Sequence, residues 1–259
     1  MGLLKLPKYV QEPGGVAPII GCRQGDIAPL VILTNFRDHV HRSEAVLDEV
    51  TFRTDAGWEV CTITGPYRET PVTVCSAGIG AGATANVMED LINLGARVFI
   101  QIGATGAIQE HIAMGDVVIP NAAVRDEGTT NYYAPKKYPA VSDYRVVSAL
   151  TAAARSAGNT VHTGIVRTTD GFYASQRIEK YVQRYHDLGV LSVEQEVAAI
   201  LTVASARGCY AGAALLVIGN LVTGEHSFNG DRMDLVEKDW FEQIHFALQA
   251  LLDLKDDLP

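Results

Sequence analysis

Short apolar runs alternate with stretches of helical periodicity along most of the chain. Runs typical of buried strands occupy residues 30–34, 72–78, 98–108, 115–124, 161–168 and 211–220. Apolar positions recur at helical spacing in residues 38–50, 78–96, 143–157, 194–207 and 234–254. This alternation predicts an α/β fold: a single three-layer domain with a mixed, largely parallel central sheet flanked by helices.

The N-terminal residues do not follow this pattern. Residues 1–27 contain Pro, Gly and isolated charges without periodicity, which predicts an N-terminal arm. No linker interrupts the remainder, so residues 28–259 are expected to form one domain. Ligands of such sheets bind at the carboxyl ends of the strands, so the residues just after each apolar run are the candidates for a site.

Composition narrows the classes of function. The net charge of −9 argues against a protein that coats nucleic acid, which needs a basic face. No apolar run is long enough to span a bilayer and no leader is evident, so we expect a cytoplasmic protein. The four cysteines have no metal-ligand spacing and are expected to be buried free thiols. Neither a metal nor another cofactor is expected.

Four segments carry candidate chemistry, each with an ordinary structural alternative. The glycines of 78–84 fit either a ligand cradle or a tight strand–helix turn. The small residues of 101–108 fit a strand-end turn. In 193–201, Glu194 and Glu196 fit dipole partners of a helix start, although a carboxylate flanked by apolar residues needs partners such as ribose hydroxyls. The aromatic pair and amide of 168–177 suit base recognition or an ordinary surface loop.

Taken in order, these segments resemble the nucleoside phosphorylase family, and within it the bacterial uridine phosphorylases. The block GARVFIQIGATGAIQEHIAMGDVVIPNAAVRDEG (95–128) follows the family nearly residue by residue, and NYYAP…YPAVSDY (131–144) is typical of the uridine-type members. The resemblance implies an enzyme that cleaves the N-glycosidic bond of a nucleoside and transfers the ribosyl group to phosphate.

The resemblance assigns residues to a base and a ribose. Phe172 and Gln176 match the residues that stack on and hydrogen-bond the uracil, and Arg177 lies one place before a second base-reading position, here Ile178. After the strand ending near residue 218, the family places an arginine, or in purine enzymes an aspartate. Here the segment is Gly219-Asn220-Leu221 and has neither residue, and the absence of the purine-type acid favours a pyrimidine-like or modified base. The ribose-binding residues are then Glu194, Gln195 and Glu196.

The implied phosphate site departs from the family. Its residues are Asn35, Arg37, His39, Arg53, Gln101, Gly103 and Ala104. His39 and Gln101 stand where the family has arginines, and Ala104 stands where it has a hydroxyl residue. Arg53 matches an arginine that reaches a neighbouring subunit's site, which predicts a homo-oligomer, either a dimer or a hexamer built from dimers.

Three hypotheses remain from the sequence. The first is phosphorolysis, with His39, Arg53 and Glu196 as the catalytic residues. The second is hydrolysis, in which His39 orients water and activity falls below about pH 6.5; the alternative for His39 is a solvated residue at a helix start. The third is a catalytically silent family member that binds a nucleoside-like ligand.

Overall fold

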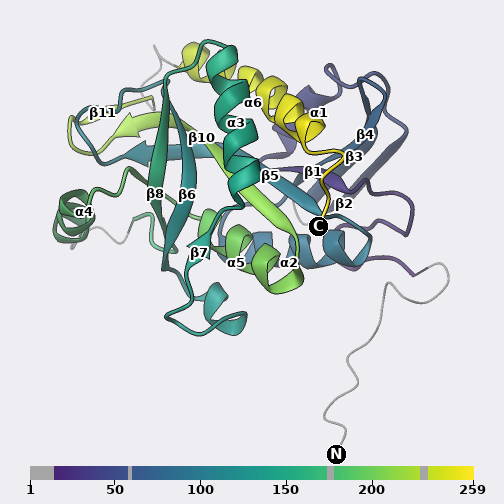
Figure 1. The fold of residues 1–259 in the computed structure, drawn as a ribbon, viewed down its shortest axis with the longest axis horizontal. Coiled ribbons are helices and arrows are strands. Elements are labelled where there is room, and N and C mark those ends of the chain that lie inside the picture. Colours follow the sequence, from purple (N-terminus) through teal and green to yellow (C-terminus); the bar gives the residue numbers. More distant parts are fainter. Residues whose placement is uncertain (1–14, 58–59, 174–177, 228–232) are drawn as a thin grey trace, which may run out of the picture.

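The fold is a mixed sheet covered by helices on both faces (Figure 1). A computed structural model describes residues 15–57, 60–173, 178–227 and 233–259. The strands are β1 (Leu30–Thr34), β2 (Phe52–Gly57), β3 (Val60–Tyr67), β4 (Thr70–Ser76), β5 (Val98–Ala107), β6 (Val117–Asp126), β7 (Ala140–Val141), β8 (Val161–Thr169), β9 (Ser192–Glu194), β10 (Tyr210–Asn220) and β11 (Glu225–His226). The helices are α1 (Arg37–Ser43), α2 (Ala81–Asn93), α3 (Tyr144–Ser156), α4 (Ile178–Asp187), α5 (Val197–Arg207) and α6 (Met233–Asp253), with a 3₁₀ turn at Thr129–Tyr132.

The centre of the sheet is parallel and one end of it closes into a ring. Strands β4, β1, β5 and β10 pair in parallel in that order. Strand β10 also pairs with β6, β6 with β8, β8 with β9, and β9 returns to β5. At the other end, β2 and β3 add an antiparallel extension to β4. The ring brings the end of β9 beside the end of β5.

Two helix layers bury the two faces of the sheet. In Figure 1, α3 and α6 pack together above the sheet and α2 and α5 pack together below it. Side chains alternate along β5: Phe99 belongs to the core under α2 and α5, and Ile100 to the core under α3 and α6. Gln101 has the parity of Phe99 and therefore faces α2 and α5. The predicted three-layer α/β fold is confirmed.

The structure differs from the predicted elements in its first third. The helix expected over residues 38–50 ends at Ser43. The following segment runs beside β3 instead, because Asp48 N donates to Pro66 O and Thr51 N donates to Thr64 O. The sequence analysis also did not predict β2, β3, the three-residue β9 or helix α4. Strands β2 and β9 and helix α4 are short or polar, and β3, although buried, alternates apolar residues with threonine and ends in Gly-Pro-Tyr.

The described part of the predicted arm packs against helix α2. Ile20 and Cys22 are buried, and the Asp90 carboxylate accepts hydrogen bonds from Ile19 N at 2.8 Å and Ile20 N at 3.3 Å.

All four cysteines are buried free thiols, as predicted. Burial raises the pKa of both Cys22 and Cys75 to about 12, so these thiols stay protonated. Among the described helices, none combines the length and apolar character needed to cross a bilayer.

Candidate active site

A buried carboxylate lies where the N-termini of α2 and α5 meet. Glu196 is the residue before α5 and is 5% exposed. Its Oε1 accepts a hydrogen bond from Gly80 N at 2.7 Å, and Gly80 immediately precedes α2. Its Oε2 lies 3.5 Å from Gln101 Nε2, which comes from β5. Glu196 therefore links the turn after β4, the turn after β9 and the middle of the sheet.

Glu194 fixes the start of α5. Its Oε2 accepts hydrogen bonds from Glu196 N at 2.6 Å and Val197 N at 2.7 Å, and Thr168 Oγ1 donates to its Oε1. Thr168 Oγ1 also accepts from Ala198 N at 2.8 Å. These contacts satisfy backbone N–H groups at the helix start, which otherwise lack partners. Glu194 thus positions Glu196, and its predicted contact with ribose stays a prediction.

Two amides and a glycine complete the cluster around Glu196. Asn35 Nδ2 donates to Gly78 O at 3.1 Å. A Cβ atom at Gly103 would lie 3.0 Å from Asn35 Oδ1 and 3.6 Å from Gln101 Nε2. The missing side chain therefore lets the Asn35 side chain approach β5 closely. We call Asn35, Gly80, Gln101, Gly103 and Glu196 the carboxylate–amide cluster.

The cluster is electronegative. Burial raises the pKa of Glu196, and burial together with the Glu196 charge raises the pKa of Glu194. Hydrogen bonds from the Gly80 N–H group and from the amides of Asn35 and Gln101 lower the pKa of Glu196, against the effect of burial. The paired carboxyls therefore hold protons more tightly than exposed ones would. Such a site suits ligands that donate hydrogen bonds, such as hydroxyl groups.

His39 lies on the other face of the sheet from this cluster. Its Nδ1 is hydrogen-bonded to Thr34 Oγ1 at 2.6 Å, and its backbone oxygen accepts from Ser43 Oγ. Leu33 is the register partner of Gln101 and shares its face, so Thr34 points to the opposite face. The sequence grouped His39 with Gln101 in one phosphate-or-water site, and these contacts do not bring the two side chains together.

The alternative of a solvated His39 is wrong, because the residue is 5% exposed. Burial, followed by the nearby Arg42 charge, lowers the pKa of His39 from 6.5 to about 4. The acidic loss of activity expected near pH 6.5 therefore moves to about pH 4 if His39 causes it. Polarity at a helix start predicts exposure, whereas His39 lies on the buried side of α1 with Val40 and Ser43.

The two arginines assigned to the phosphate site bind carboxylates outside the cluster. Arg37 forms an ion pair with Asp55 of β2, and Arg53 forms one with Glu44. Ala104 is half-buried, and it alternates with Gly103 along β5, so it points to the opposite face. In this arrangement the cluster has amide donors and no guanidinium from either residue.

The assigned base residues come from the ends of β8 and β10. Phe172 is 55% exposed and packs edge-to-face against Tyr173. Gln176 and Arg177 lie outside the described residues. Leu221 lies over β5, where a Cβ at Gly106 would approach its Cδ1 to 2.7 Å.

Asn220 holds the turn that carries Leu221. Its Nδ2 donates to Gln109 O and Ile112 O, and its Oδ1 accepts from Val222 N and Thr223 N. Both the NH₂ group and the oxygen of the Asn220 amide are therefore hydrogen-bonded to the backbone.

Sequence reasoning missed the roles of Gly80 and Thr168. The glycine-rich turn of 78–84 was the available signal for Gly80, whose φ of 100° suits glycine. Nothing local in the sequence marks Thr168.

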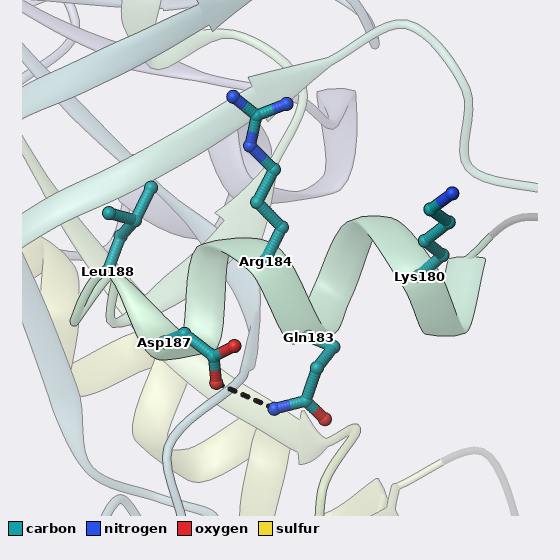
Figure 2. Close-up of a pocket in the computed structure, with 5 residues that line it drawn as sticks. All are labelled: Lys180, Gln183, Arg184, Asp187 and Leu188. Carbon is teal, nitrogen blue, oxygen red and sulfur yellow. Dashed lines mark hydrogen bonds between the residues drawn. The ribbon is translucent and has the colours of Figure 1, made fainter.

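The surface also carries a hollow of about 550 Å³ on helix α4 (Figure 2). Its lining residues are Lys180, Gln183, Arg184, Asp187 and Leu188, and Gln183 Nε2 donates to Asp187 Oδ1 at 2.7 Å. None of them belongs to the carboxylate–amide cluster. This hollow on α4 is therefore not evidence of where the reaction takes place. Within the described ranges, no three His, Cys, Asp or Glu side chains form a group that could hold a metal ion.

The buried carboxylate between two helix N-termini makes the carboxylate–amide cluster the candidate site for a small ligand that bears hydroxyl groups. Residues 29–245 match the family described as the phosphorylase superfamily, and the chain belongs to that family. The resemblance to nucleoside phosphorylases predicted from the sequence is confirmed, as is the prediction of an enzyme.

Individual relatives cover most of the chain. A uridine phosphorylase of Escherichia coli K12 is 35% identical over 247 residues, which are 90% of this chain and 97% of the relative. A uridine phosphorylase of Thermococcus kodakarensis is 36% identical and covers 86% of this chain and 84% of its own. A guanosine phosphorylase of Halorubrum lacusprofundi is 31% identical and covers 85% and 90%.

The buried His39 predicts a loss of stability in acid. The unfolded chain takes up a proton near pH 6.5, whereas the folded chain does so only near pH 4. The unfolded state thus binds more protons in this window, and the free energy of unfolding falls as the pH drops through it, by at most about 3 kcal/mol. His39→Asn should flatten the decline of the urea midpoint between pH 6.5 and 4. His41→Asn, at an exposed histidine of the same helix, should leave it unchanged. Equal slopes in wild type and His39→Asn would contradict the assignment.

Proposed function

We propose that this protein cleaves the N-glycosidic bond of a nucleoside and transfers the ribosyl group to phosphate. The observation that carries the proposal is the buried Glu196 carboxylate, held by Gly80 N–H and lined by the amides of Asn35 and Gln101. The family and the names of the relatives, uridine and guanosine phosphorylases, support the same reaction class.

The protein must hold the ribose, neutralise the leaving base and place a nucleophile beside the anomeric carbon. Positive charge develops on the sugar as the bond to the base breaks, and the sugar must be held with its anomeric carbon open to the nucleophile. Glu196 can accept hydrogen bonds from ribose hydroxyls and oppose the developing charge. We place the nucleophile beside the amides of Asn35 and Gln101, which line Glu196. Glu194 fixes the turn that presents Glu196, and Gln195 stays assigned to the ribose.

The predicted hydrolytic alternative is not favoured. Its proposed base, His39, contacts Thr34 on the other face of the sheet, and the relatives are phosphorylases by name. The silent-member alternative is not favoured either, because the relatives are named as enzymes and Glu196 is held in place by three separate segments.

We also propose which residues bind the base and which class of base is preferred. We assign it to Phe172, Gln176, Arg177 and Leu221, with a pyrimidine or similarly small heterocycle as the preferred base. The exposure of Phe172 leaves its ring face open to stacking. A cytoplasmic location is proposed from the buried free thiols, which are typical of reducing compartments.

We also propose a homo-oligomer, either a dimer or a hexamer of dimers. Arg53 lies on β2, its side chain is half exposed, and it is anchored by Glu44. An arginine in that place can reach a second subunit and supply the positive charge that the carboxylate–amide cluster lacks within one chain.

Replacing Glu196 tests the reaction. Glu196→Gln keeps an acceptor for Gly80 N–H and removes the charge, so kcat/KM for ribose 1-phosphate formation should fall at least about tenfold. The thermal midpoint should change little. The assay uses uridine, cytidine, guanosine and adenosine, with and without phosphate. Glu110→Gln is the matched control, because Glu110 is exposed and lies outside the carboxylate–amide cluster. Unchanged kinetics in Glu196→Gln on every active substrate would remove Glu196 from the site.

Complementation tests the shared site. Arg53→Ala and Glu196→Ala chains, each inactive alone, should regain about a quarter of wild-type activity when co-expressed as dimers, because half of the dimers are hybrid and half of their sites are intact. Light scattering on the wild type gives the assembly directly. A monomer at micromolar concentration, or hybrids without activity, would contradict the proposal.

A further inference from the structure

The Gln101 amide has an acceptor without a partner. Gln101 is 2% exposed, and no donor in the described part of the chain reaches its Oε1. A buried acceptor left unpaired costs about 1–3 kcal/mol, so such groups in proteins are generally satisfied by a ligand or a neighbour. Gln101 lies in the carboxylate–amide cluster, with its Nε2 3.5 Å from Glu196 Oε2. The unpaired oxygen is therefore placed to accept from a bound ligand.

The neighbouring carboxylate sets which end of the amide faces the ligand. Gln101 Nε2 lies 3.5 Å from Glu196 Oε2, and only the NH₂ end can donate to a carboxylate. With the nitrogen held on that side, Oε1 is the end left for the ligand. An acceptor at this position selects a ligand that carries a hydrogen-bond donor.

The charges around the cluster favour a ligand with little negative charge. Glu194 on β9 and Glu196 before α5 are both buried, and the Gly80 N–H group at the start of α2 is already used by Glu196. The first turn of α2 has no acidic residue, and His39 on α1 is neutral at pH 7 because burial lowers its pKa. On the elements α1 and β2, Arg37, Arg42 and Arg53 form ion pairs with Asp55, Asp38 and Glu44.

We infer that this site takes phosphate as the monoprotonated anion, H₂PO₄⁻, with one of its hydroxyl groups donating to Gln101 Oε1. The inference rests on the proposed phosphorolysis. The monoanion has the donor that Oε1 needs and half the charge of the dianion opposite Glu196 and Glu194. A ribose hydroxyl has the same donor chemistry, and the experiment below separates the two sources.

The transfer balances with this species. A phosphate oxygen forms a bond to the anomeric carbon, and the bond from that carbon to the base nitrogen breaks with its electron pair on the base. Of the two phosphate protons, one is taken up by the base nitrogen and the other stays on the ribose 1-phosphate. No oxidant, reductant or further reactant is required.

The test is the pH dependence of the KM for total phosphate at saturating nucleoside, measured across the second pKa of inorganic phosphate. In the wild type, KM should be constant below that pKa and rise about tenfold per pH unit above it, as the monoanion is depleted. Gln101→Arg should remove the rise, because a guanidinium donates hydrogen bonds to the dianion and balances its charge. Sulfate, which is a dianion without a donor, should inhibit Gln101→Arg and not the wild type. Both proteins contain Glu194, Glu196 and His39, so their difference isolates position 101.

Gln183→Arg adds the same side chain on the exposed face of α4 and should behave as the wild type (Figure 2). A wild-type KM that is flat or falls with rising pH would overturn the inference while leaving phosphorolysis in place. A flat KM combined with loss of discrimination against 2′-deoxynucleosides in Gln101→Met would assign the acceptor to ribose and also overturn it. Absence of ribose 1-phosphate at every pH and phosphate concentration would instead overturn the proposed function.

Discussion

The hydrogen bond from Gly80 N to Glu196 Oε1 joins two helix starts that are far apart in the sequence. Helix α2 follows β4 and helix α5 follows β9, and both helices cover the same face of the sheet. A carboxylate shared between their N-termini is stabilised by unpaired N–H groups and by the aligned peptide dipoles. The same bond fixes where Glu196 lies above Gln101 and Gly103.

This constraint also limits the chemistry. A helix N-terminus is an ordinary site for an external anion, but the carboxyl groups of Glu194 and Glu196 already occupy these positions. Phosphate bound nearby must tolerate two carboxyls and an amide acceptor. Within one chain, Arg37 and Arg53 are turned towards Asp55 and Glu44. Binding of phosphate at the carboxylate–amide cluster therefore requires that the phosphate donates a hydrogen bond and that a second subunit supplies positive charge.

Much of the fold followed from apolar periodicity, because β1, β5, β10 and the long helices are buried over many residues. Strand β9 was not predicted, since three residues carry no period, yet it closes the ring and sets the turn before α5. Glu196 was found through the resemblance and through its apolar flanks. The partners that hold it, Gly80 and Thr168 by way of Glu194, come from distant segments, and only the tertiary structure brings them together. His39 was misjudged because local polarity predicts exposure and takes no account of packing by α1.

The central claim is that Glu196 holds the sugar while phosphate lies over Gly103 beside Gln101. A crystal structure of Glu196→Gln, which slows turnover, soaked with its preferred nucleoside and phosphate tests it most directly. The account predicts ribose hydroxyls within hydrogen-bond distance of residue 196 and a phosphate oxygen within hydrogen-bond distance of Gln101 Oε1. A nucleoside bound with its sugar away from residue 196, or phosphate bound only through the Arg37 or His39 side of the sheet, would contradict it.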